Sequence, residues 1–136
     1  MAQRSIPARG DAVPLFTDMS APRRVWEGVG GPLVAGALTG VALGLSAVAY
    51  VVVVLVSFLG GIPAGAQHRT LRGALLRACA AGALWALALL GAFHLLHSEA
   101  RVALPEPEVL MLAFGVVPSC LVAAVVWSLT RRRSRG

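Results

Sequence analysis

Residues 31–66 read GPLVAGALTGVALGLSAVAYVVVVLVSFLGGIPAGA and contain no charged side chain. This run exceeds the roughly 20 apolar residues that a helix needs to cross the hydrocarbon core of a bilayer. The rest of the composition agrees, because 57% of the 136 residues are hydrophobic and only 13% are charged. A water-soluble domain of this length needs more polar surface than that. The chain is therefore predicted to be an all-α integral membrane protein.

Three apolar segments separated by polar loops predict three transmembrane helices. Pro32 suits the first turn of a helix, where its missing N–H costs nothing, and the glycines at 60 and 61 with Pro63 favour a stop. Before the first helix, the sequence is polar and irregular, which predicts a disordered N-terminal tail; Met19 is an alternative start of the chain. The predicted segments are the tail 1–31, the helices 32–59, 73–96 and 108–130, and a basic C-terminal tail 131–136.

The first apolar run also allows a second arrangement, in which residues 31–66 fold back as two short spans that turn near Gly44 to Ser46. This hairpin places every arginine except Arg101 on one side, as the positive-inside rule favours. Each arm would have only about 15 residues, below the usual 17 to 25, and no polar turn separates the arms. The single helix over 32–59 is therefore the preferred prediction.

The net charge of +6 comes from 12 arginines without any lysine. Because they flank apolar segments, the arginines are expected to anchor and orient helices rather than bind nucleic acid. With three helices, the charge rule predicts a cell-membrane protein with its N-terminus outside and its C-terminus in the cytoplasm. The bias toward Arg, Ala, Gly, Val and Leu is typical of a bacterial genome of high GC content. In this orientation the inner arginines are Arg69, Arg72, Arg77, Arg131, Arg132, Arg133 and Arg135, and the outer ones near a helix are Arg23, Arg24 and Arg101.

Each predicted helix carries a row of small residues at a spacing of four, which keeps the row on one helix face. Small residues allow helix backbones to approach closely in lipid, where no hydrophobic force drives helices together. The glycine row of the first helix, a glycine zipper, is the strongest of the three signals. The rows are Gly36, Gly40 and Gly44; Ala78, Gly82 and Ala86; and Gly115, Ser119 and Ala123.

A stripe of polar side chains marks a second face of the first predicted helix. Thr39, Ser46, Tyr50 and Ser57 are spaced 7, 4 and 7 residues apart, which places them within about 40° of one another on a helix. This stripe is consistent with the lining of a small hydrated path. The alternative is that each hydroxyl bonds the carbonyl one turn back and has no further role.

Residues with the chemistry of a catalytic site are scarce. Apart from Glu108 at the first position of the third, the three predicted helices contain no acidic residue, and their serines have no histidine at a comparable depth. His94 and His97 share a face near the predicted outer surface, close to Glu106 and Glu108, and are weak candidates for a divalent metal site. No cofactor is expected.

These observations predict a small, non-catalytic multi-pass membrane protein that packs with itself or a larger membrane partner through its small-residue faces. One alternative is an accessory subunit of a transporter or small-solute channel, lined by the polar stripe. A further alternative is a metal-binding protein of the outer face.

Overall fold

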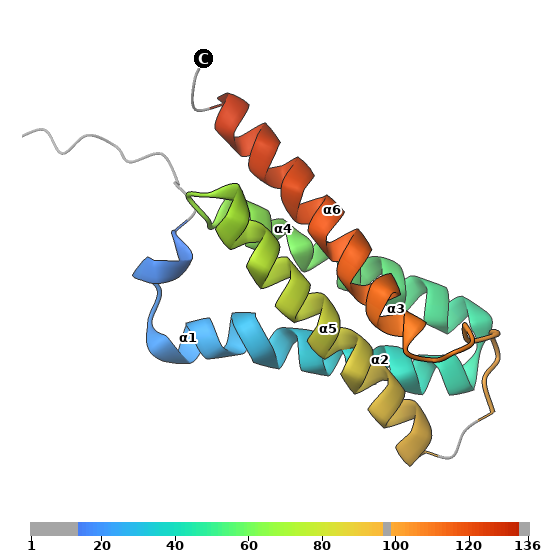
Figure 1. The fold of residues 1–136 in the computed structure, drawn as a ribbon. Coiled ribbons are helices and arrows are strands. Elements are labelled where there is room, and N and C mark those ends of the chain that lie inside the picture. The colour runs from blue at the N-terminus through green and yellow to red at the C-terminus, as the bar shows by residue number, and fades with distance from the viewer. Residues whose placement is uncertain (1–13, 97–98, 134–136) are drawn as a thin grey trace, which may run out of the picture.

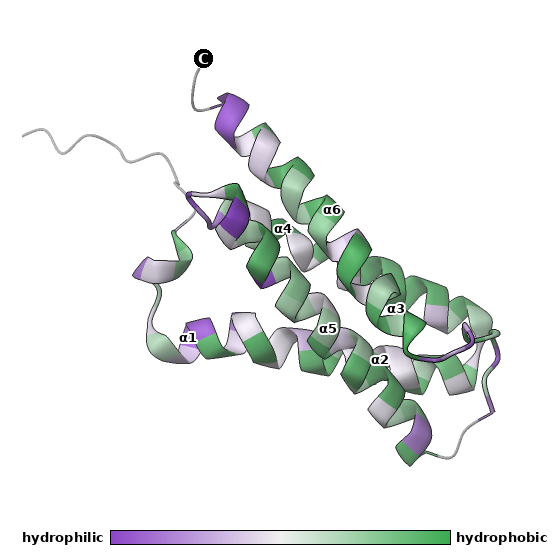
Figure 2. Ribbon diagram, in the orientation of Figure 1, coloured by the Kyte–Doolittle hydropathy of each residue, from purple (hydrophilic) through white to green (hydrophobic). Residues whose placement is uncertain are grey.

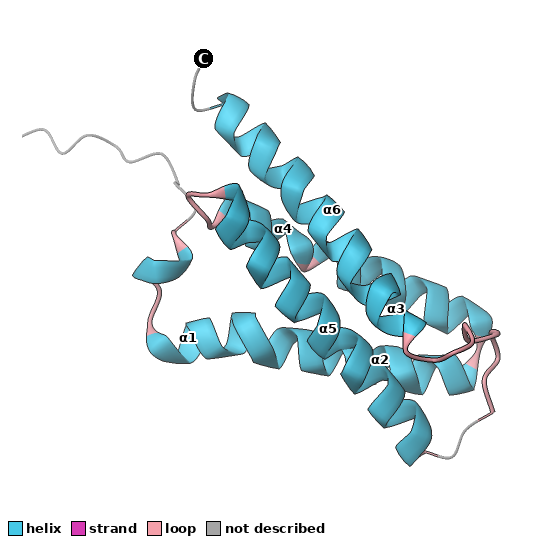
Figure 3. Ribbon diagram, in the orientation of Figure 1, coloured by secondary structure: helices cyan, strands magenta, loops and turns pink. Residues whose placement is uncertain are grey.

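The computed structural model describes residues 14–96 and 99–133, and these residues form helices joined by short loops, with no strand among them (Figures 1 and 3). Several consecutive elements join end to end, so that the helices make four rods. The elements are η1 (Phe16–Asp18), α1 (Ala21–Val25), η2 (Trp26–Gly30), α2 (Gly31–Leu45), α3 (Ala47–Leu59), α4 (Gly61–Ala66), α5 (Leu71–Leu95) and α6 (Leu110–Arg133).

Four rods are long and apolar enough to cross a membrane, in contrast to the three predicted from the sequence. They cover Ala21–Leu45, Ala47–Ala66, Leu71–Leu95 and Leu110–Arg133. At 1.5 Å per residue, the shortest of them measures roughly 30 Å, about the thickness of the hydrocarbon core. Figure 2 shows that hydrophilic residues gather toward the rod ends and that apolar residues cover the middle.

The predicted single helix over 32–59 is wrong because the chain turns at Ser46. Ser46 is extended, with φ −163° and ψ 152°, and its hydroxyl accepts a hydrogen bond from the Ala49 N–H at 3.0 Å. A serine in this geometry is a favourable N-cap, so the break needs no glycine turn and no polar loop. The turn lies where the alternative hairpin puts it.

The two arms of this hairpin are longer than the sequence suggests. The first begins at Ala21, ten residues before the charge-free run, and the second continues past Leu59 to Ala66. Pro63 is tolerated because it lies in the first turn of α4, where no intrahelical N–H bond is lost. The length objection to the hairpin therefore does not hold.

Part of the N-terminal tail predicted to be disordered is helical. Residues 1–13 lie outside the described residues, but η1, α1 and η2 occupy much of 14–31. The backbone N–H of Phe16 donates to the Gln67 carbonyl at 3.1 Å, and the Met19 side chain is buried. This segment is thereby attached to the loop between α4 and α5.

Both described ends of the chain lie at one end of the bundle, whereas the three-helix prediction places the termini on opposite sides of the membrane. The Phe16–Gln67 bond places the N-terminal segment beside the α4–α5 loop, and the Arg131 guanidinium donates to the Arg69 carbonyl in the same loop. At the opposite end, the Arg101 N–H bonds the Leu43 carbonyl beside the α2–α3 turn. An even number of rods accounts for this arrangement.

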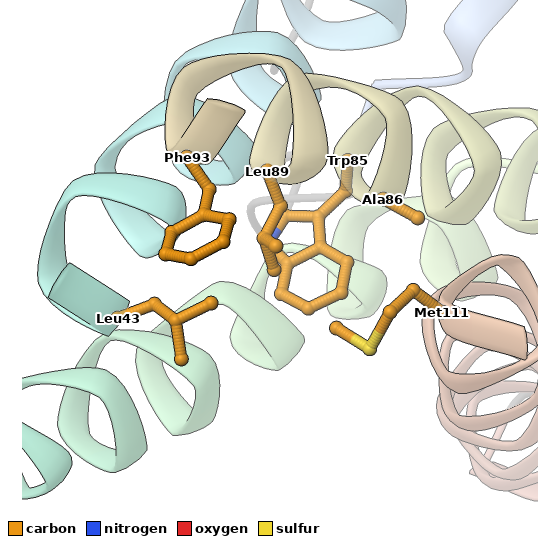
Figure 4. Packing of buried hydrophobic residues seen from close by; sticks show 6 residues of the cluster. All are labelled: Leu43, Trp85, Ala86, Leu89, Phe93 and Met111. Carbon is orange, nitrogen blue, oxygen red and sulfur yellow. The ribbon is translucent and has the colours of Figure 1, made fainter. Parts of the chain in front are cut away.

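The core forms where α2 and α6 pack against the central helix α5. Leu43 and Leu89 are completely buried, and Trp85 fills the space between helices (Figure 4). In contrast, α3 has no buried residue. A second, smaller cluster joins α4, α5 and α6 through Ala64, Ala78 and Ala123. The main cluster consists of Leu43, Trp85, Ala86, Leu89, Phe93 and Met111.

Candidate functional site

A charged cluster lies between the N-terminal rod and the second turn of α5. The Arg77 Nη2 atom lies 3.4 Å from Glu27 Oε2, and Nη1 donates to Gln67 Oε1. The Gln67 Nε2 atom donates to the same Glu27 oxygen at 3.0 Å. The Arg77 side chain is only 10% exposed, so the carboxylate and the amide replace the water that a guanidinium normally binds.

The ring of Phe16 packs against the Arg77 guanidinium. The Arg77 Cζ atom lies 4.2 Å from the centre of the Phe16 ring, a cation–π geometry. Phe16 also stacks on His68, with 5.6 Å between ring centres. Burial lowers the pKa of His68, and the positive charge of Arg77 lowers it further, although a hydrogen bond with the Ala64 carbonyl opposes the shift. The net shift favours the neutral form of the His68 imidazole.

Glu27 is shared by two arginines. The Arg23 Nε atom donates to Glu27 Oε1 at 2.8 Å, one helical turn away, while Arg77 approaches Oε2. Two guanidinium groups therefore share one carboxylate in this cluster. Among the described contacts of the cluster, this leaves an excess of one positive charge.

A cavity of about 470 Å³ begins at this cluster and extends along α5. Glu27 and Arg77 are at its polar end, and Trp85 and Phe58, with ring centres 6.1 Å apart, are among its apolar walls. Its volume is in the range of sites for single small-molecule ligands, roughly 300 to 1,000 Å³. Its walls come from η2 and α2 on one side, α3 and α4 on another, and α5, with Ser119 from α6.

The cavity is open to the outer surface of the bundle. Its walls include side chains that are more than half exposed, namely Leu38, Val52 and Val56. These residues come from α2 and α3, in the middle of the two N-terminal rods. If the rods cross a bilayer, this opening faces lipid rather than water.

The structure separates the predicted polar stripe into two helices. Thr39 is buried in α2 and donates to the Ala35 carbonyl, and Ser57 of α3 donates to the Val53 carbonyl, each at 2.7 Å. Ser46 caps α3, and Tyr50 packs against the main core cluster. The four side chains therefore do not form one line on one helix, although Ser57 does line the cavity.

The small-residue rows lie where helices of this chain touch. A Cβ atom added at Gly36 would collide with the Trp85 carbonyl, and one at Gly40 with the Leu89 carbonyl, whereas Gly44 is only half-buried. Gly82 of α5 and Gly115 of α6 meet backbone to backbone. The other row members occupy the same interfaces: Ala78, Ala86 and Ala123 are buried, and Ser119 is half-buried.

The metal candidates form a pair rather than a cluster. His94 Nε2 lies 2.8 Å from Glu108 Oε2, and both side chains are about half exposed. His97 lies outside the described residues, and within those residues no group of three His, Cys, Asp or Glu side chains is arranged to hold a metal ion. Glu106 is exposed in the same loop.

Sequence reasoning missed the charged cluster because it assigned Glu27 to the tail and Arg77 to anchoring at a helix end. One signal was available: Arg23 and Glu27 have the i, i+4 spacing that pairs side chains on a helix. The partner of Arg77, 50 residues away in sequence, depends on the hairpin and has no local signal. The chain matches no protein-family model, and no curated protein or solved structure shows significant similarity to it.

Proposed function

We propose that the chain is a multi-pass protein of the cell membrane with four spanning helices and with both described ends in the cytoplasm. The distribution of charge between the two ends of the bundle supports this orientation, since arginine-rich loops favour the cytoplasmic side. At the opposite end, the loop between α5 and α6 contains one arginine, Arg101, and the acidic residues nearby are Glu99, Glu106 and Glu108. The arginines at or near the proposed cytoplasmic end are Arg23, Arg24, Arg69, Arg72, Arg77, Arg131, Arg132 and Arg133.

Single cysteines test this topology. The native thiols Cys79 and Cys120 are free, so both are first replaced by alanine. In intact cells, a membrane-impermeant maleimide is expected to label Ser46→Cys and Ala100→Cys, and to label Ser20→Cys only after permeabilisation. Labelling of Ser20→Cys in intact cells, with Ser46→Cys protected throughout, would instead indicate three spans.

We further propose that the protein is non-catalytic and binds a membrane-soluble molecule in the cavity. The observation that carries this proposal is the combination in one space of an apolar wall, a charged end and an opening between α2 and α3. Pockets with mostly apolar walls and a few convergent polar groups are typical of small-molecule sites. Because the opening faces the proposed bilayer, the ligand enters from lipid.

A neighbouring pair of alanines on α5 provides a matched test. Ala81 lines the cavity, whereas Ala80 is exposed and does not line it. A phospholipid with a photoreactive group on its acyl chain is expected to crosslink the cavity walls in liposomes. Ala81→Phe fills the cavity and should lower this crosslinking severalfold, while Ala80→Phe should leave it unchanged. Equal crosslinking in all three proteins would exclude the cavity as the site.

Two roles predicted from the sequence stay predictions. One is packing with a second copy or a larger membrane protein, and the other is a role as a transporter or channel subunit. Gly36 and Gly40 face α5 of the same chain. A partner therefore has no access to this part of the glycine row while α5 is in place, and an association would use another surface.

A further inference from the structure

We propose that the ligand is an anionic phospholipid of the surrounding bilayer, with its phosphate beside Arg77 and Arg23 and one acyl chain in the cavity. This inference rests on the proposed function, which places a membrane-soluble ligand in the same space. It adds the charge of the ligand, its orientation and the residues that select it.

The charge of the cluster favours an anionic headgroup. Glu27 is 2.8 Å from Arg23 and 3.4 Å from Arg77, so one carboxylate faces two guanidinium groups. A phosphate at this end of the cavity supplies the second negative charge. A guanidinium group is suited to phosphate because it is planar, always charged and weakly hydrated.

The position of Arg77 along α5 matches the depth of a headgroup. Arg77 is six residues after Leu71, which places it roughly 9 Å from the start of the helix. An arginine at this depth reaches the interface by extending its side chain. Trp26, which also lines the cavity, is 60% exposed beside Glu27, and tryptophan is enriched at membrane interfaces.

The apolar part of the cavity fits a chain within one leaflet. From Arg77 to Trp85, both of which line the cavity, α5 rises roughly 12 Å. Trp85 is two residues past the midpoint of α5, so the cavity ends near the middle of the roughly 30 Å hydrocarbon core. A lipid with its phosphate at Arg77 therefore places the headgroup-proximal part of one acyl chain against Phe58 and Trp85.

Trp85 provides a reporter at the inner end of the site. In a variant with Trp26→Tyr, which keeps an amphipathic ring at the interface, and Trp127→Phe, Trp85 is the single tryptophan, and it is only 7% exposed. The full chain is reconstituted in phosphatidylcholine vesicles that contain a minor fraction of phosphatidylglycerol. Acyl chains brominated on one lipid or the other quench nearby indole fluorescence, so comparison at equal bromolipid fractions measures which lipid occupies the cavity.

We expect phosphatidylglycerol to be favoured at Trp85 about fivefold, the ratio that corresponds to about 1 kcal/mol for one basic residue near a lipid surface. Arg77→Gln should abolish the preference, and Arg77→Lys should retain part of it. Arg72→Gln is the matched control, because Arg72 is exposed on the same helix and does not line the cavity. Circular dichroism shows whether each variant folds. If Arg77→Gln fails to fold, the lipid preference of Arg77→Lys and the comparison of the two brominated lipids in the wild type test the inference instead.

Two results separate this inference from the proposed function. If both brominated lipids quench Trp85 equally, or if Arg77→Gln keeps the preference, the cavity takes acyl chains without selecting an anionic headgroup and the present inference fails. If neither lipid quenches Trp85 and Ala81→Phe changes nothing, the cavity holds no lipid and the proposed function fails with it.

Discussion

Gly40→Ala is expected to destabilise the fold because it adds one methyl group between two backbones. The new Cβ atom would collide with the Leu89 carbonyl and lie 3.0 Å from the Ala92 Cβ atom. Neither neighbour is the end of a flexible side chain, so α2 must move away from α5. Overpacking of this kind costs about 1 to 3 kcal/mol. The better helix propensity of alanine offsets about 1 kcal/mol, leaving a net loss of up to about 2 kcal/mol.

Gly91→Ala is the matched control, since it adds the same methyl group to α5. Gly91 is exposed, and an added Cβ atom meets nothing within 4 Å. Only the propensity term remains, so this variant should be neutral or up to about 1 kcal/mol more stable than the wild type. Reversible unfolding in mixed detergent micelles measures both changes.

Equal stability of Gly40→Ala and Gly91→Ala would contradict a close contact between α2 and α5 at Gly40. A second result would be equally damaging: unchanged stability in Gly40→Ala together with the loss of an oligomer in detergent. That combination would assign Gly40 to a contact between chains, as the sequence first suggests, rather than to the contact with α5.

Three further changes test the cluster and the turn. Glu27→Gln leaves Arg77 without its carboxylate and should lower the free energy of unfolding by about 3 kcal/mol. The double variant with Glu27→Gln and Arg77→Gln should be more stable than Glu27→Gln alone in the same detergent assay, because the uncompensated charge is gone. Burial lowers the pKa of His68, so the unfolded chain binds a proton at a higher pH than the folded chain does. Stability should therefore fall as the pH drops below about 6.5. The free energy of unfolding, measured above and below this pH, should change less in His68→Gln than in the wild type. Ser46→Ala removes the N-cap of α3 and should cost about 1 kcal/mol, and an unaltered melting curve would contradict the capping role.

The helical and apolar character of the chain was predictable because both depend on local composition. The segments predicted at 73–96 and 108–130 differ by at most three residues at either end from α5 (Leu71–Leu95) and α6 (Leu110–Arg133). Polar loops separate these segments in the sequence, so hydropathy alone locates them. The presence of small residues at helix contacts follows from the same local reasoning.

The turn at Ser46 was harder to predict because a single hydroxyl produces it. Sequence rules associate a turn with several polar residues or with glycine and proline, and the residues on both sides of Ser46 are apolar. The charge distribution did favour the hairpin, since it gathers the arginines at one end. The length rule was misleading because it counted only uncharged residues, whereas the first rod begins at Ala21 and includes three charged residues.

The small residues that hold the fold together also account for the position of the cavity. Gly36 and Gly40 bring α2 onto α5, whereas α1 and the start of α5 diverge like the arms of a V (Figure 1). Two straight rods that cross at a close contact must separate on either side of it, and the separation grows with distance from the crossing. The cavity lies on the side of this crossing toward Glu27 and Arg77, which contact each other across the gap. A substitution that moves the crossing should therefore change both stability and lipid occupancy, although neither glycine lines the cavity.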